Sequence, residues 1–258
     1  MTRRIVRIDA LPESARRCSG YDAIVCVDVL LSATTIVTAL AQGRRVFSAP
    51  EAGQAAWVHS RVEDPLVVTD VLDRSDDDVR FCGPSWLAAA KGKPDAVVHV
   101  SPLAEMLAAA ARRARVFVAC LRNLEATANE VSRYHQCVAI LGAGEAGEVS
   151  SEDQMAAAWL AVRLQQRGFD LEGRNTADEV GRWGASDPSL VGLSRSAERL
   201  RARGRGADVD FVLGHVDDVN AACAFADGEL RDPAAARRRL QGDASTPAWG
   251  STLPVFGH

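Results

Sequence analysis

Short, wholly apolar runs alternate along this chain with alanine-rich stretches, and this alternation constrains the fold most. Continuous Val, Ile and Leu runs are typical of strands that are covered on both faces. Strand–helix alternation indicates helices layered on a sheet, so we expect an α/β protein, layered α/β/α, with mostly buried sheets. Strands are predicted at 4–8, 23–28, 45–48, 66–69, 95–100, 115–120, 136–141 and 208–213, and helices at 33–42, 50–60, 84–91, 102–113, 124–133, 151–167, 174–182, 194–203 and 217–226.

The length of 258 residues and the 47% hydrophobic content allow one large domain or two small ones. We place a division near 120–135 and predict one α/β unit over 1–125 and a second over 126–230. Residues 231–258 carry one short helical piece at 233–241 and then lose all periodicity. They are predicted to form a tail, or an arm that docks through Trp249 and Phe256.

Composition and charge exclude several classes of protein. The net charge of −4 gives no basic field for nucleic acid. We find no apolar run of 18 residues, and the first residues lack the apolar core of a secretion signal. The six cysteines are scattered without metal-ligand spacing, which favours buried thiols in a reducing compartment. We therefore expect a cytoplasmic protein whose partner is a small molecule, with no nucleic acid and no membrane.

A glycine cluster in "AILGAGEAGEVSSEDQMAAAW" (139–159) has three interpretations. A dinucleotide-binding loop, and with it a nicotinamide-dependent oxidoreductase, needs glycines that open the helix directly and an acid at the end of the next strand. Here "EVSS" intervenes, and no convincing strand follows. A solvated helix cap explains Ser150 or Ser151 followed by Glu152 and Asp153. In the third interpretation these carboxylates, at the carboxyl edge of a sheet, hold Mg²⁺.

A second segment, "DAIVCVDVLLSATTIVTALAQG" (22–43), has an apolar strand that ends in Asp28 before a threonine-rich helix start. It resembles the opening of the 2-phosphosulfolactate phosphatase (ComB) family. Further segments resemble that family in the same order, so the likeness covers roughly residues 3–230. These segments are 81–90, 118–128, 138–164 and 194–217.

The resemblance implies two α/β lobes, a bound Mg²⁺, a small phosphorylated acid as substrate and a homodimer. It also implies the site residues. The implied catalytic residues are Asp28, Asn123, Glu152 and Asp153, of which Asp28, Glu152 and Asp153 are the metal ligands. The implied substrate-binding residues are Ser32, Thr34 and Ser101.

The chain departs from the family pattern around the phosphate. Leu31 replaces an arginine, residues 99–105 ("HVSPLAE") lack the family's Asn, Gly, Thr and Arg, and Cys82-Gly83-Pro84 replaces Asn-Ser-Pro. Each charge-assisted hydrogen bond that is lost costs about 1.5–3 kcal/mol. The leading hypothesis is therefore a Mg²⁺-dependent phosphatase-like hydrolase whose pocket has changed. The alternative is a repurposed member with different chemistry, or a catalytically inactive binding protein.

Several candidates have structural explanations that need no function. Asp28 and Asn123 could cap helices, Ser101-Pro102 is a good cap pair for the next helix, and His99 could be a core histidine. Convergence of the four acidic and amide residues in an open cleft would favour an enzyme. A cleft plugged by Leu31, Leu103 or Pro102 would favour a binding protein.

Overall fold

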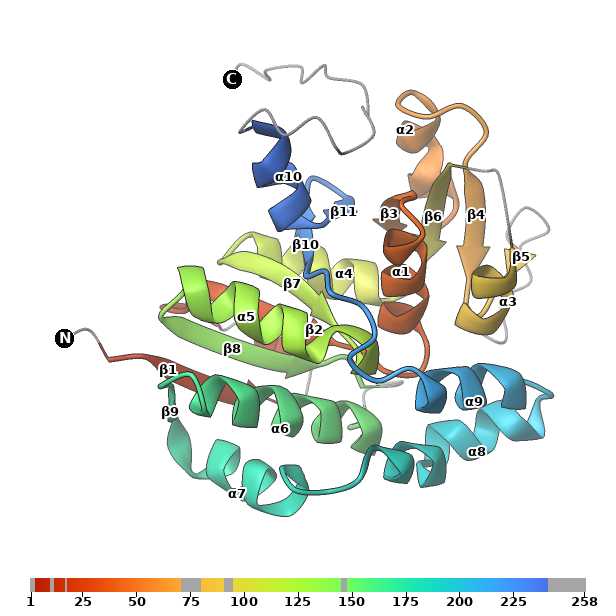
Figure 1. Cartoon of the computed structure of the whole chain (residues 1–258). Helices are drawn as coiled ribbons and strands as arrows, with labels where there is room; N and C mark the ends of the chain where they lie inside the picture. Colours follow the sequence, from red (N-terminus) through yellow and green to blue (C-terminus); the bar gives the residue numbers. More distant parts are fainter. Residues whose placement is uncertain are drawn as a thin grey trace.

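The computed structural model describes residues 3–9, 12–16, 18–70, 80–90, 95–144 and 148–240. These residues form a layered α/β/α fold around one eleven-stranded sheet, as predicted (Figure 1). The strands are β1 (Ile5–Asp9), β2 (Ala23–Val27), β3 (Arg45–Ala49), β4 (Leu66–Thr69), β5 (Arg80–Phe81), β6 (Ala96–Val100), β7 (Arg115–Ala119), β8 (Cys137–Gly142), β9 (Asp170–Leu171), β10 (Cys223–Ala226) and β11 (Glu229–Arg231). The helices are α1 (Ser32–Ala41), α2 (Ala56–His59), α3 (Pro84–Ala89), α4 (Leu103–Ala111), α5 (Leu124–Tyr134), α6 (Ser151–Gln165), α7 (Gly173–Trp183), α8 (Arg195–Ala202), α9 (Gly206–Gly214) and α10 (Pro233–Leu240), with 3-10 turns η1 (Pro12–Arg16), η2 (Gly53–Ala55), η3 (Leu121–Asn123) and η4 (Pro188–Leu193).

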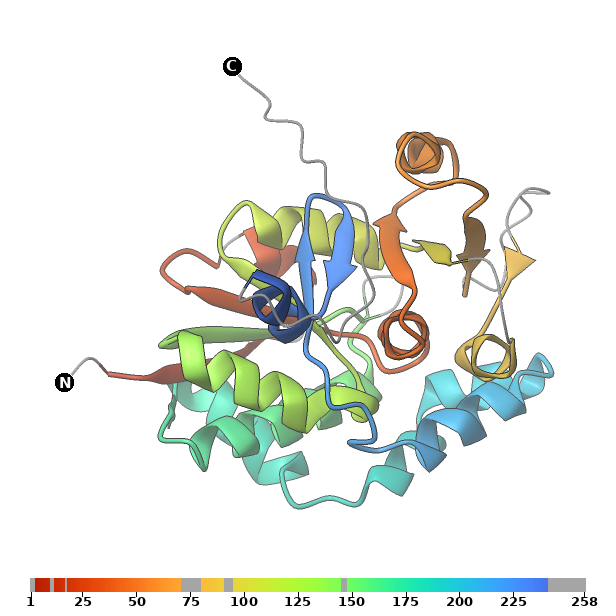
Figure 2. The same ribbon diagram turned by 45° about the horizontal axis from the view of Figure 1, so that its top comes forward.

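The sheet consists of two parallel groups that an antiparallel hairpin joins. Its strand order is β5-β4-β6-β3-β11-β10-β7-β2-β8-β1-β9. The parallel groups are β5-β4-β6-β3 and β7-β2-β8-β1-β9, and β10 and β11 pair antiparallel with β7 and β3. Figure 2 shows this blue hairpin beside the orange strand β3. In Figure 1 the arrows of β4 and β8, one from each group, both point toward α9.

The two faces of the sheet carry separate hydrophobic clusters, because successive strand residues point to opposite faces. On β2, Val25 and Val27 pack with α5 and α6, whereas Ile24 and Cys26 pack with α1 and α4. All five β2 residues are buried. The continuous apolar run at this strand is thus explained by helices on both of its faces.

Two predicted elements are wrong. Residues 208–213, predicted as a strand, lie in helix α9, and residues 217–226, predicted as a helix, end in strand β10. Val209 and Val212 are the buried apolar positions of α9, a spacing of three that a six-residue window cannot separate from a strand. The strands β5, β9 and β11 were not predicted, and each has only two or three residues.

Helix α10 confirms the helical piece predicted at 233–241. Trp249 and Phe256, the proposed docking residues, lie outside the described residues. The division into 1–125, 126–230 and 231–258 stays a prediction. Within the described part of the chain, no helix has the length and apolar character to cross a membrane. The described cysteines are free thiols, and all but Cys137, which is half-buried, are buried.

Candidate functional site

Asp28 stands directly after β2, where the chain turns into α1. Its Oδ1 accepts the backbone N–H of Ser32 at 3.2 Å, and its carbonyl oxygen accepts that of Ala33 at 3.1 Å. Asp28 therefore caps the first turn of α1, as its position in the sequence allows. Its side chain remains half-buried rather than closed off, so a ligand can reach it.

Asp153 lies in the first turn of α6 and binds two loops at the carboxyl edge of the sheet. Its Oδ1 accepts the N–H of Val29, after β2, at 2.8 Å, and its Oδ2 accepts that of Gly144, after β8, at 3.1 Å. Asp153 and its neighbour Glu152 are both buried. The carboxyl ends of β2 and β8 are thus held against the N-terminus of α6.

Gly144 is the glycine that this arrangement requires. Its φ is +63°, and a Cβ on it would lie 2.5 Å from the carbonyl oxygen of Glu148. The Gly144 N–H donates to the Asp153 carboxylate. In a dinucleotide-binding loop, backbone N–H groups of this kind would instead donate to a pyrophosphate at the helix N-terminus. The strand β9 does follow α6 and ends beside Glu172, but Glu172 accepts the hydroxyl of Tyr21. The geometry therefore favours a carboxylate-presenting turn over a dinucleotide loop.

The pKa values of Asp28 and Asp153 are raised by burial and by repulsion from neighbouring acids. Burial, and then the charge of Asp70, raise the pKa of Asp28 to about 7. Burial, and then the charges of Asp28 and Glu152, raise the pKa of Asp153 well above its ordinary value. The charges of two predicted metal ligands, Asp28 and Glu152, therefore act on the third, Asp153, within a single region.

Asp70 and His99 join this region from the other parallel group. Asp70 follows β4, His99 lies in β6, and His99 Nε2 is 3.3 Å from Asp70 Oδ2. Both side chains are buried, and both act on the charge of Asp28. Asp70 was missed from the sequence, although the signal was available: like Asp28, it is an acid that directly ends a buried apolar strand.

Asn123, the amide candidate, forms hydrogen bonds within its own turn rather than with the acids. Asn123 Oδ1 accepts the N–H of Cys120 at 3.0 Å, and its Nδ2 donates to the carbonyl oxygen of Val118 at 3.1 Å. These bonds close the η3 turn after β7, so a structural role explains the residue, as the cap interpretation allowed.

The hydroxyl candidates have different surroundings. Thr34 Oγ1 donates to the carbonyl oxygen of Val29 at 2.8 Å, and Ser32 contacts Asp28 through its backbone N–H. The Ser101 hydroxyl is buried and lacks a hydrogen-bond partner among the described residues. Ser101 is not the cap of α4, because that helix begins at Leu103 with Pro102 at the cap position.

The aliphatic replacements are core residues. Leu31 packs in the cluster under α6, and Leu103 packs in the cluster under α1 and α4. Leu31, where the family resemblance places an arginine, and Leu103, in the segment that lacks the family's Asn, Gly, Thr and Arg, are thus both part of the hydrophobic core. Pro102 is exposed.

Gly83, within the altered Cys-Gly-Pro segment, has a local packing role. Asp208 of α9 is buried and accepts the N–H of Ser85 at 3.1 Å as well as the Ser85 hydroxyl. A Cβ on Gly83 would overlap the Asp208 carboxylate. The segment therefore joins α3 to α9.

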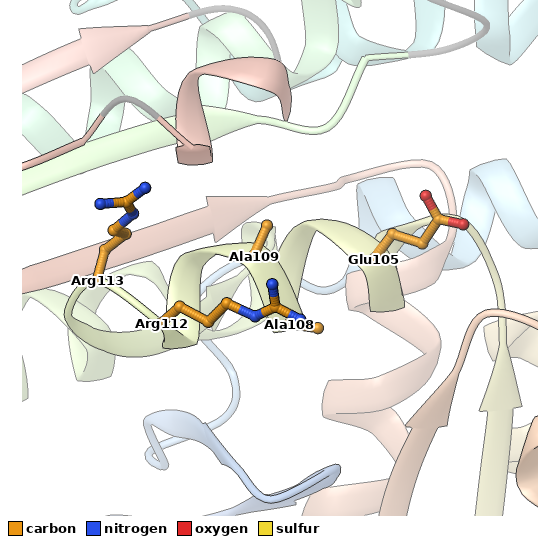
Figure 3. Close-up of a pocket in the computed structure, with 5 residues that line it drawn as sticks. All are labelled: Glu105, Ala108, Ala109, Arg112 and Arg113. Carbon is orange, nitrogen blue, oxygen red and sulfur yellow. The ribbon is translucent and has the colours of Figure 1, made fainter.

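One large pocket lies elsewhere. It has a volume of about 520 Å³ and opens on the surface of α4, where Figure 3 shows Glu105 at one end and Arg112 and Arg113 at the other. Its lining residues are Glu105, Ala108, Ala109, Arg112 and Arg113, none of which belongs to the acidic region.

The donor set has the chemistry of a hard-cation site. Carboxylate oxygens are the ligands that Mg²⁺ prefers, and it commonly takes only one or two of them, with waters and phosphate in the remaining positions. In the described parts of the chain, no group of three or more His, Cys, Asp or Glu side chains has the geometry to hold a metal. Asp28 and Asp153, whose charges repel each other, fit a partial ligand set of this kind.

Comparison with known proteins gives one family. The model of the family described as 2-phosphosulpholactate phosphatase matches residues 9–220. Among curated proteins, none matches the chain.

Proposed function

The chain belongs to the 2-phosphosulpholactate phosphatase family, and from this premise we propose that it is a Mg²⁺-dependent hydrolase of a small acidic phosphate monoester. The observation that supports the proposal is that the charge of half-buried Asp28, after β2, acts on buried Asp153, in the first turn of α6, at the carboxyl edge of the sheet. Ligands of α/β sheets bind in this crevice.

Asp28 and Asp153 would hold the metal as a partial ligand set, and Glu152, whose charge acts on Asp153, adds to the negative charge beside it. A cation between them would relieve the repulsion that raises the pKa values of Asp28 and Asp153. When bound, Mg²⁺ supplies an electrophile that offsets the charge developing on the phosphoryl oxygens.

The chain's own groups supply orientation. The N–H groups of Val29 and Gly144 fix both oxygens of Asp153, whereas the Ser32 N–H holds only Oδ1 of Asp28. The Ser32 hydroxyl also interacts with the Asp28 carboxylate, so a single residue at the start of α1 orients this acid. Ser101, with its buried hydroxyl directly after β6, is the proposed substrate contact on that side, and Ser32 and Thr34 lie at the start of α1.

Phosphate release tests this function directly. The purified protein is assayed with 2-phosphosulfolactate and a panel of phospho-acids, with Mg²⁺ and with EDTA. We expect Mg²⁺-dependent release that Asp28→Asn lowers at least about 100-fold, the scale of losing a major electrostatic contact. Asp187→Asn is the matched control, because Asp187 also caps a helical turn, by accepting the Ser189 N–H at 2.8 Å, but lies on the exposed surface. No release from any compound by folded protein would contradict the proposal.

A binding protein without turnover is the second candidate. The observation that favours it is the use of Leu31 and Leu103 as core residues in place of phosphate contacts. Binding of phospho-acids without release of phosphate would support it.

We also propose that the protein is a cytoplasmic homodimer that acts on small molecules rather than on nucleic acid. The family resemblance supports the dimer, and the net charge of −4 and the free thiols support the remainder. Light scattering after size-exclusion chromatography should give twice the 27.5 kDa chain mass.

A further inference from the structure

A second pocket lies beside the joining hairpin, at the carboxyl end of β3. Its volume is about 510 Å³, which is within the range of small-molecule sites. It is bounded by β3, the α2 segment, helix α4 and the β10–β11 turn, and Figure 2 shows this hairpin beside β3. None of its described lining residues belongs to the acidic region, so the proposed hydrolase leaves the pocket without a role.

The pocket has a preformed apolar wall. The Trp57 ring meets the Phe47 ring edge-on, with ring centroids 5.6 Å apart. It also packs so closely on the β10–β11 turn that a Cβ on Gly228 would lie 2.6 Å from the indole. Further apolar lining comes from Phe225 and from three alanines of α4, Ala104, Ala108 and Ala111. An apolar group can therefore bind against an indole that the fold already holds in place.

Two opposite charges line the same pocket without pairing. The Arg61 guanidinium lies over the Trp57 ring, 4.7 Å from its centroid, and Asp227 stands in the hairpin turn with a φ of +51°. Both residues are exposed, and among the described residues neither side chain forms an ion pair. A simple anion would be repelled by Asp227 and a simple cation by Arg61, whereas a zwitterion complements both charges.

Ser48 adds a hydrogen-bonding group that the fold leaves unused. It lines the pocket, is 6% exposed, and its hydroxyl has no hydrogen-bond partner in the part of the chain that the structure describes. A buried hydroxyl without a partner destabilises the fold. Because a hydroxyl can both donate and accept, either charged group of a zwitterion would satisfy it.

We propose that this pocket binds a small zwitterionic amino acid with an apolar side chain. The carboxylate of the ligand faces Arg61, its ammonium group faces Asp227, and its side chain lies against Trp57 and the alanines of α4. The buried hydroxyl of Ser48 bonds one of the two charged groups.

Calorimetric titration of the full chain tests the proposal with three probes that share one apolar body. L-phenylalanine carries both charges, 3-phenylpropionate lacks the ammonium group, and 2-phenylethylamine lacks the carboxylate. We expect the wild type to bind L-phenylalanine at least about tenfold more tightly than either analogue, because each analogue loses one charge-assisted contact.

Charge variants assign each end of the ligand. Asp227→Asn should remove the advantage of L-phenylalanine over 3-phenylpropionate, and Arg61→Gln should remove its advantage over 2-phenylethylamine. Asparagine tolerates a positive φ, so the hairpin turn is retained. Asp64→Asn is the matched control, because Asp64 is also exposed and has a φ of +47° but does not line the pocket. It should leave both preferences unchanged.

A blocking variant locates the site. Ala108 is an exposed residue of α4 that lines the pocket, so Ala108→Trp fills it without disturbing the core and should abolish binding. No binding of L-phenylalanine by the folded wild type at millimolar concentration, or binding no tighter than that of either analogue, would overturn the proposal. So would undiminished binding by Ala108→Trp, or charge variants that keep the wild-type preferences. None of these results depends on phosphate release, so they are separate from the test of the hydrolase.

Discussion

The carboxyl group of Asp28 is held by the Ser32 amide and surrounded by other acids, and this environment determines its charge. Because its pKa is raised to about 7 on folding, the folded protein binds this proton more tightly than the unfolded chain. The resulting stability is fully present below the unfolded pKa, near 4, and is lost as the pH rises through about 7.

Asp28→Asn should therefore stabilise the metal-free protein only at higher pH. We expect no change in melting temperature near pH 4 and a rise of about 3 °C at pH 8, measured by thermal unfolding in EDTA. The asparagine Oδ1 can still accept the Ser32 amide, so the helix cap is retained. A variant that is less stable than the wild type at pH 8 would show that the carboxylate is not a source of repulsion.

Gly83 has a steric requirement that is independent of the chemistry. Gly83→Ala should lower the free energy of unfolding by about 1–3 kcal/mol, because its Cβ overlaps the Asp208 carboxylate that holds Ser85. Gly181→Ala is the control: its Cβ would meet nothing within 4 Å, and it lies in helix α7, so we expect stabilisation of about 0.5–1 kcal/mol. Urea titration measures both, and equal effects would refute the steric account.

At single positions, the sequence singled out acids at strand and helix ends. The charges of Asp28 and Glu152 act on Asp153, and the metal role of all three stays a prediction, whereas Asn123 is explained by the η3 turn. Asp70 has the same local signal as Asp28, an acid that directly ends an apolar strand, but its electrostatic effect on Asp28 joins the two parallel groups, and the sequence alone does not show that pairing.

Among the elements, the connection after α9 depends on Arg122. Its guanidinium bonds both oxygens of Asp218, at 2.9 and 2.7 Å, and reaches Thr38 of α1 at 2.8 Å. Asp218→Ala should destabilise the protein by about 2 kcal/mol, less than a fully buried pair because Asp218 is partly exposed. Asp210→Ala, an exposed acid of α9, should change stability by less than about 0.5 kcal/mol in the same urea titration. No difference between the variants would contradict this role.

Prediction of the elements failed where an apolar run was short. The run in α9 and the alanine-rich stretch before β10 each suit two structures by composition, and long-range pairing decides between them. The longer, repeated strand–helix units from β1 to α6 were predicted because their local pattern and their packing agree.

For the whole molecule, the interleaved sheet predicts cooperative unfolding. Strand β8 lies between β1 and β2, and Glu229 of the joining hairpin binds Arg45 of β3 at 3.0 and 3.1 Å. We expect one urea transition, coincident by tryptophan fluorescence and by circular dichroism. Two separate transitions would instead support independent units divided near residue 125.

The central claim is that Asp28 and Asp153 share one divalent cation. Crystals soaked in Mn²⁺, an anomalous scatterer that also takes oxygen ligands, test it most directly. We expect an anomalous peak within about 2.3 Å of carboxylate oxygens from both residues. An ordered site elsewhere, or none at millimolar Mn²⁺ with both carboxylates clearly resolved, would contradict it.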